Sequence, residues 1–300
     1  MKKNYKTQLL TLTFSLLFVM MMAVPATNVI AAQAPVGLGS TSNFAVLAGE
    51  TITNTGTTVI NGDAGSDVGI YPGSAFTGSA SVTMTAGTAY LSDAGGVAST
   101  AQTDLVTAYN DAAGRTPVTI IPTELGETTL TPGIYASDSG TFEINGTLTL
   151  DAQGDPNGVF VFQMSSSLVT GTSSNVGLLN SARYCRIFWQ VGSSATLGVS
   201  SHFVGHIFAY TSIWVGTYAT VQGQLLARTG EVTLDNNTIT NGLCATVTAS
   251  DTTGTTDTAK TSTSNNPDTG ENIPAIGIPI ATLLTAGYLL IYANRKRNRL

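Results

Sequence analysis

The sequence predicts a mainly β domain with one long helix. Between Pro35 and about Ala245, Gly, Thr, Ser, Ala and Val dominate, and turn-forming residues separate many short runs of strand-like residues. A single stretch instead repeats its apolar residues at helical spacing. No repeat of fixed length is present, so the strand pattern by itself fits a β-sandwich nearly as well as an irregular solenoid.

The strands are predicted at short intervals along this region. The clearest begins at Thr147, where Leu148 and Leu150 alternate with threonines, as expected of a half-buried strand. The run from Val159 to Phe162 is bulkier and predicts a strand buried on both sides. The full set is 44–47, 58–61, 81–84, 133–136, 147–150, 159–163, 187–191, 203–209, 212–215, 224–227 and 232–234.

The helix is predicted over about 97–113. Its apolar residues fall three and four apart, at Ala98, Ala101, Leu105, Ala108, Tyr109 and Ala112. Asp93 or Ser99 is a candidate cap at its start, and Gly114 and Pro117 mark its end. We expect the helix to lie along one side of the β domain and to cover part of its apolar surface.

Seven segments carry a resemblance to a known family. They keep its order and approximate spacing over roughly two hundred residues, at 38–49, 60–65, 108–114, 130–135, 146–163, 187–196 and 230–237. Together they resemble the ice-binding-protein-like domains. The resemblance implies a discontinuous right-handed β-solenoid with one long α-helix packed alongside, and it decides against the sandwich. It argues less strongly for ice binding, because one fold can host several functions.

Both ends of the chain read as targeting signals. Three lysines near the start, the apolar run 9–24 and the small residues around 32–34 predict a signal peptide over 1–34. The Thr/Ser-rich segment 246–265 lacks bulky apolar residues and predicts a disordered stalk. The β domain is then 35–245.

The segment 266–300 resembles a cell-wall sorting signal of Gram-positive bacteria. Asn266-Pro267-Asp268-Thr269-Gly270 precedes an apolar run of about 273–293 and a basic tail. Asn-Pro stands where Leu-Pro is usual, which leaves the sortase class open. The resemblance implies that a sortase joins Thr269 to peptidoglycan and that the membrane is engaged only transiently. A plain C-terminal membrane anchor is the alternative, since about twenty apolar residues span a bilayer.

Charge and cysteines agree with an exported protein. Five of the 12 Lys and Arg residues and 17 of the 18 Asp and Glu residues lie within 35–269, a net charge of −12. Within this segment the sequence shows no cluster of Lys and Arg, which nucleic-acid binding requires. Cys185 and Cys244 are the only cysteines. In an exported chain they predict one disulfide, with two buried thiols as the alternative.

Residues able to support catalysis or metal binding are sparse. His202 and His206 lie four apart on a predicted strand and would share a side of it, but the sequence offers no obvious third ligand. Asp151 and Asp155 flank Gly154, and Asx turns explain both without calcium. Nothing selects a glycosidase pair among Glu124, Glu127 and Glu143. The sequence therefore predicts no enzyme, no metal site and no cofactor.

Threonine is the residue type that points to a function. A Thr-(Ala/Gly)-any-(Thr/Asn) pattern is seen on ice-binding faces of some bacterial relatives, and it occurs here in full or in part at several turns. The candidate ice-binding residues are Thr55, Thr58, Thr77, Thr85, Thr88, Thr170 and Thr172. In so Thr-rich a chain, chance matches are expected, and threonine also has high strand propensity without any ligand.

The sequence thus predicts a secreted, wall-anchored protein of a Gram-positive bacterium that adsorbs to ice through a flat Thr-rich side of a solenoid. Its predicted partners are an ice surface, a sortase and peptidoglycan. The alternative is a surface adhesin or structural module on the same fold. Tyr210, Trp214 and Tyr218, spaced four apart, would then form a sugar platform, or else they fill the core.

Overall fold

The computed structural model describes residues 33–62, 65–91, 93 and 96–242. The predicted stalk, the sorting signal and all but the last two residues of the predicted signal peptide lie outside these residues and stay predictions. No helix within the described residues combines the length and apolar character needed to span a bilayer.

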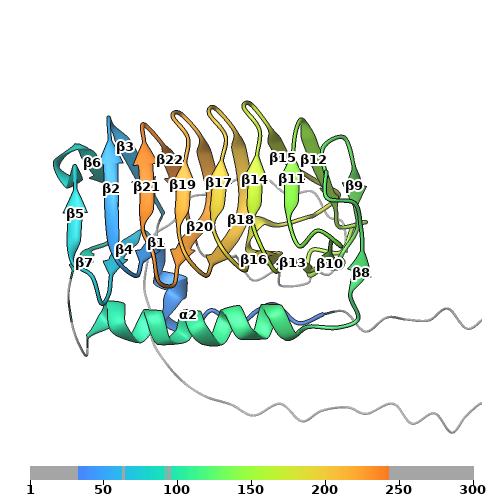
Figure 1. Ribbon diagram of the computed structural model, residues 1–300, viewed down its shortest axis with the longest axis horizontal. Coiled ribbons are helices and arrows are strands. Elements are labelled where there is room, and N and C mark those ends of the chain that lie inside the picture. Colours follow the sequence, from blue (N-terminus) through green and yellow to red (C-terminus); the bar gives the residue numbers. More distant parts are fainter. Residues whose placement is uncertain (1–32, 63–64, 92, 94–95, 243–300) are drawn as a thin grey trace, which may run out of the picture. The chain divides into compact units, whose positions relative to one another are not determined.

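The described chain forms stacked coils of parallel β-strands with one long helix alongside (Figure 1). Every strand pairing that the structure describes is parallel. The mainly β fold with a single long helix that the sequence predicts is therefore confirmed. The coils have three sides, formed by two sheets.

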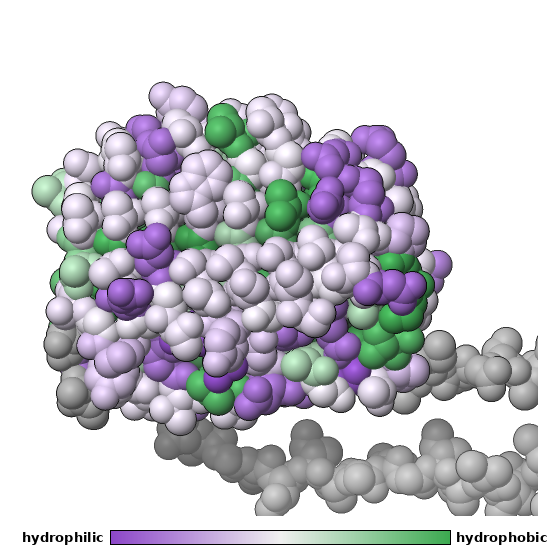
Figure 2. Space-filling model, in the orientation of Figure 1, coloured by the Kyte–Doolittle hydropathy of each residue, from purple (hydrophilic) through white to green (hydrophobic). Residues whose placement is uncertain are grey.

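The first side is a seven-stranded sheet. Its strands are, in spatial order, β11 (Phe142–Ile144), β14 (Leu168–Thr170), β17 (Ala195–Leu197), β19 (Ile213–Val215), β21 (Val232–Asp235), β2 (Thr51–Thr55) and β5 (Ala75–Thr77). Along six of these strands, buried residues alternate with exposed or half-exposed ones, and on the edge strand β5 the inward Phe76 is half-buried. Figure 2 shows this side uncovered, with residues of intermediate hydropathy over most of its area.

A fifteen-stranded sheet forms the other two sides. One of them holds β8 (Thr119–Ile120), β10 (Gly133–Ala136), β13 (Phe160–Met164), β16 (Ile187–Val191), β1 (Phe44–Ala48), β4 (Asp67–Ile70) and β7 (Ala89–Leu91). The other holds β9 (Thr129–Leu130), β12 (Thr147–Asp151), β15 (Asn175–Leu179), β22 (Thr238–Thr240), β3 (Thr58–Asn61) and β6 (Val82–Met84). Two longer strands, β18 (His202–Ala209) and β20 (Thr220–Ala227), run through both sides.

The order of the coils in space differs from their order in the chain. The N-terminal strand β2 pairs with β21, near the end of the domain, and β3 pairs with β22. From that end of the stack the helix leads the chain to the opposite end, where β8 begins. The later coils then stack back toward the N-terminal ones. In Figure 1 the blue strands accordingly lie beside the orange ones.

The helix α2 (Val97–Gly114) matches the predicted span to within one residue. The Asp93 carboxylate accepts hydrogen bonds from the backbone N–H groups of Val97 and Ala98, so the predicted cap is confirmed. The buried residues of α2 are Ala98, Ala101, Gln102, Leu105, Ala108, Tyr109 and Ala112. They pack against an apolar layer on the outside of the sheet that includes Val161, Phe188 and Phe208. This layer explains why β13 is almost entirely buried, as its run of bulky residues predicts.

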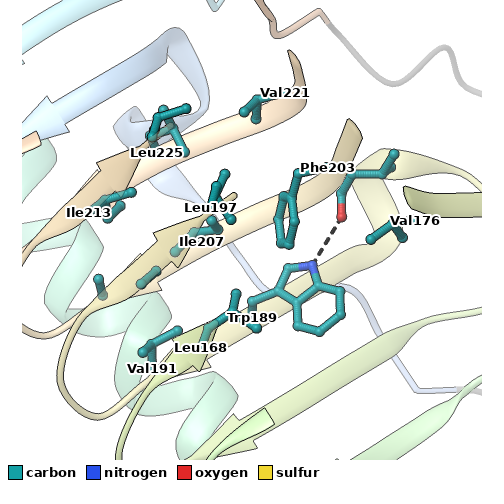
Figure 3. Packing of buried hydrophobic residues seen from close by; sticks show 14 of the residues in the cluster. Leu168, Val176, Trp189, Val191, Leu197, Phe203, Ile207, Ile213, Val221 and Leu225 are labelled. Carbon is teal, nitrogen blue, oxygen red and sulfur yellow. Dashed lines mark hydrogen bonds between the residues drawn. The ribbon is translucent and has the colours of Figure 1, made fainter. Parts of the chain in front are cut away.

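A second apolar cluster fills the inside of the coils (Figure 3). Phe162 and Trp189 stack with their ring centroids 3.9 Å apart, on neighbouring strands in register. The indole N–H of Trp189 donates to the backbone carbonyl of Val204 at 3.0 Å, so its one polar atom is satisfied in the core. The interior is therefore a packed core that holds the three sides at fixed positions.

Candidate functional site

The three sides differ in what covers them. The side that holds β13 and β16 lies beneath α2. The side that holds β12 and β22 continues into β18 and β20, and there the short helix η3 (Tyr184–Arg186) packs against both strands. The hydroxyl of Tyr184 also bonds to the backbone of Gly242. The outward residues of the seven-stranded sheet are exposed or half-exposed along its full width, and so are those of β12, β15, β22 and β3 on the neighbouring side.

Threonines line up across this seven-stranded sheet. One outward residue from each strand falls in a single rank, because all seven strands pair in register. From β5 to β11 the rank reads Thr77, Thr53, Thr233, Trp214, Thr196, Val169 and Glu143. Neighbouring members lie about 4.8 Å apart across the strands, the general spacing of a β-sheet.

Along strand β2 the threonines repeat in the second direction. Thr51, Thr53 and Thr55 all point outward, while Ile52 and Asn54 are buried. Alternate residues on a strand are about 6.6 Å apart, so β2 and its neighbours present a two-dimensional grid of hydroxyl and methyl groups. The grid is densest over β5, β2 and β21.

Charged groups on this sheet lie toward its margins. Glu143 occupies the last strand of the rank. Asp235, at the end of β21, accepts hydrogen bonds from the Thr217 hydroxyl and the Asn236 amide. Glu231 immediately precedes β21 and lies 3.4 Å from the Thr51 hydroxyl. The central Thr53 and Thr233 positions carry no charge.

Two of the seven candidate threonines are buried, which corrects the set drawn from the sequence. Thr58 is fully buried, and its hydroxyl accepts a hydrogen bond from the backbone N–H of Asn237. Thr170 is also buried, and its hydroxyl accepts one from the N–H of Gly198. Both hydroxyls hold turns of the coil and do not reach the surface.

The other five candidates are exposed but do not all lie together. Thr77 is in the rank described above, and Thr55 ends β2 on the same sheet. Thr172 lies in the turn after β14, and Thr85 and Thr88 follow β6 outside this sheet. Thr88 donates its backbone N–H to the Asp67 carboxylate.

Sequence reasoning missed most of the rank. Thr53, Thr196 and Thr233 do not belong to the Thr-(Ala/Gly)-any-(Thr/Asn) turn pattern. Their signal was a different one, a lone outward residue between two buried ones, as in Val232-Thr233-Leu234 and Ala195-Thr196-Leu197.

The two histidines do not share a side of the strand, contrary to the prediction. His202 is exposed, and its ring bonds to the Thr220 hydroxyl. His206 is buried between Tyr184 and Phe188, on the other side of a bend at Gly205, where φ is +115°. Burial lowers the pKa of His206 to about 4, although the Gln224 side chain partly opposes this. No group of three potential metal ligands occurs among the described residues.

The acidic residues singled out in the sequence have structural partners. Asp151 and Asp155 each accept the backbone N–H two residues ahead, so both Asx turns are confirmed. The Glu124 carboxylate accepts from the N–H groups of Asn145 and Gly126. Partial burial raises the pKa of Glu124, but these hydrogen bonds outweigh it and the net shift is downward.

One half of the predicted disulfide lies within the described chain. Cys185 is disulfide-bonded, at the centre of η3. Cys244 falls outside the described residues.

Comparison with known proteins decides the family. Residues 46–240, about two thirds of the chain, match the family described as ice-binding-like. The chain belongs to this family. It is 43% identical, over 206 residues, to a protein named ice-binding protein from Nostoc sp. (strain HG1), and the match covers 68% of this chain and 73% of that one.

Solved structures of ice-binding proteins share the fold of this family member. An ice-binding protein from an Antarctic biological consortium superposes with a TM-score of 0.66 at 40% identity, covering 70% of this chain and 92% of that one. For one from the Antarctic ascomycete Antarctomyces psychrotrophicus the TM-score is 0.64 at 37% identity, with coverage of 69% and 98%. The names of these relatives refer to ice binding and not to an enzymatic reaction.

Proposed function

We propose that this protein adsorbs to ice through the seven-stranded sheet of a right-handed solenoid, without turnover or cofactor. One observation carries the proposal: threonines from neighbouring strands form an in-register rank on a side that does not lie beneath α2. The names of its relatives support ice as the ligand.

Threonine suits this task for physical reasons. Ice offers a repeating lattice of water and no charge, so the receptor must hold weakly polar groups at regular, fixed positions. Threonine is stiff at χ1 because its side chain branches at Cβ, so its methyl and hydroxyl keep their places. The methyl excludes loosely held water, while the hydroxyl anchors ordered water that bridges to the lattice. The sheet supplies the two spacings, about 4.8 and 6.6 Å.

We place the centre of the contact on β5, β2 and β21. There Thr77, Thr53 and Thr233 follow one another without interruption. Trp214 comes next in the rank and projects a bulky side chain that is 45% exposed. The contact with ice therefore weakens from β19 onward, on the far side of β21 from β2.

We further propose that the protein is exported and fixed to the cell wall through Thr269. The apolar run and basic tail that follow the Asn-Pro-Asp-Thr-Gly pentapeptide support this. Adsorption of the domain would hold ice at the cell surface or stop its growth there.

The proposal is tested by measuring thermal hysteresis and inhibition of ice recrystallisation with purified residues 35–265. We expect activity in the parent, and its loss when Thr53 or Thr233 is replaced by Tyr, which would raise a bulky group above the flat sheet. The matched control is Thr240→Tyr, because Thr240 is an exposed strand threonine on another side. Inactivity of the parent at high micromolar concentration would refute ice binding.

A surface adhesin is the second candidate. The exposure of Tyr210, Trp214 and Tyr218 favours it, since all three rings are available to a ligand and none fills the core. Inactivity toward ice, with binding to a surface glycan, would support this alternative.

A further inference from the structure

A groove lies beside the C-terminal half of α2 and shares no lining residue with the threonine rank. Its volume is about 540 Å³, within the general range of small-molecule sites, and it is open to solvent. It is lined by Tyr109 and Ala113 of the helix, by Tyr210, and by polar residues from the coil corners.

Two tyrosine rings form one end of the groove and are held in place. Tyr109 and Tyr210 have their ring centroids 6.2 Å apart. The Arg228 guanidinium lies over both rings, at 4.6 Å from the centroid of Tyr109 and 5.0 Å from that of Tyr210. Cation–π attraction fixes the ring positions before any ligand arrives, which lowers the entropy lost on binding.

The polar groups of the groove present hydrogen-bond acceptors. The Gln163 amide nitrogen donates to the backbone carbonyls of Ala112 and Arg115, at 2.8 and 3.0 Å. The Gln190 amide nitrogen donates to the Met164 carbonyl at 3.3 Å. Both nitrogens are thus engaged, and the two Oε1 atoms receive no hydrogen bond from the described residues. Ser165 adds an exposed hydroxyl.

The lining contains no Asp, Glu, Lys or Arg among the described residues, so it does not select a charged ligand. It offers an aromatic wall to an apolar face and acceptors to several hydroxyl donors. A sugar ring has both, since its C–H face stacks on aromatic rings and its rim carries O–H groups. We propose that this groove binds one ring of a neutral saccharide, stacked against Tyr210 and donating hydroxyl hydrogens to Gln163 and Gln190.

The test is ligand-observed NMR with the full chain and, one at a time, glucose, galactose, mannose and N-acetylglucosamine. We expect saturable binding of at least one sugar in the millimolar range. Tyr210→Ala removes the stacking surface, and Ala113→Trp fills the groove from an exposed helix position. Each should weaken binding about tenfold or more.

Tyr218→Asn is the matched control, since Tyr218 is an exposed ring outside the groove and asparagine tolerates its φ of +61°. It should bind as the parent does. The proposal is overturned if none of the four sugars binds saturably, or if binding survives both groove variants. Ice activity is measured on the same samples and should persist in the groove variants. The test therefore separates the proposed saccharide site from the proposed ice-binding surface.

Discussion

Gly205 and Gly223 are paired across β18 and β20, and both have positive φ, at +115° and +146°. A Cβ built on Gly223 would lie 1.9 Å from the carbonyl oxygen of Gly205. The pair lets two adjacent strands turn the same corner of the coil together. It also places His202 and His206 in different surroundings, although only three residues separate them.

This pair leads to the first prediction. Gly223→Ala should reduce the free energy of unfolding by about 3 kcal/mol, because the new methyl group overlaps backbone and the required φ strains an L-residue. Urea unfolding measures the change. Gly114→Ala is the control, since a Cβ there meets nothing within 4 Å, and it should change stability by less than about 0.5 kcal/mol. Equal stabilities of the two variants would contradict the corner role.

The buried threonines give a second prediction. Thr58→Val keeps the shape but leaves the Asn237 N–H without its acceptor, so the free energy of unfolding should fall by about 1–2 kcal/mol. Ice activity should stay the same, because the Thr58 hydroxyl is not at the surface. Thr55→Val, at an exposed position, should leave stability nearly unchanged. If the Thr58→Val variant lost ice activity, Thr58 would belong to the ice-binding site after all.

A third prediction concerns Trp214, which interrupts the rank between Thr196 and Thr233. Trp214→Thr would extend the unbroken run from three strands to five. We expect thermal hysteresis to rise roughly twofold, with little change in stability because the ring is 45% exposed. A fall in activity would instead show that the indole itself contacts ice.

The fourth prediction follows from the burial of His206, whose pKa is lowered to about 4. Between pH 6.5 and pH 4 the unfolded chain binds a proton at this residue that the folded chain does not, so stability falls as pH falls through this window. From pH 7 to pH 5 the loss should be about 2 kcal/mol. Chemical unfolding at the two pH values measures it.

The control for this pH dependence is the exposed histidine. His206→Gln should remove most of the loss between pH 7 and pH 5, whereas His202→Gln should keep it. If the His206→Gln variant still loses the full amount, about 2 kcal/mol of stability, between pH 7 and pH 5, other titrating groups cause the pH dependence.

Local pattern was enough to predict much of this fold. Alternation predicted the strand at 147–150, which the structure extends to Asp151, and helical spacing predicted α2. These features depend on neighbours within a few residues of one another. The pairing of β2 with β21 could not be read this way, since nothing local in Thr51–Thr55 indicates which distant strand adjoins it.

The functional surface was harder to predict for the same reason. A turn motif picked out Thr58 and Thr170, but whether a hydroxyl points out of the coil depends on the corner geometry around it. The rank of threonines arises only when seven strands are placed in register. The bend at Gly205 likewise separates the two histidines that a straight strand would have put on one side.

The insertion of the first coils next to the last one also bears on how the chain folds. Thr51 and Glu231, in contact in the finished protein, are 180 residues apart in sequence. Closing so long a loop costs chain entropy before the contact stabilises anything, and folds rich in such contacts form slowly. The N-terminal strands β2 and β3 have no partner on one edge until β21 and β22 have been synthesised. The domain is therefore built to assemble late and as a whole, so that its first coils stay incomplete until the chain is nearly finished.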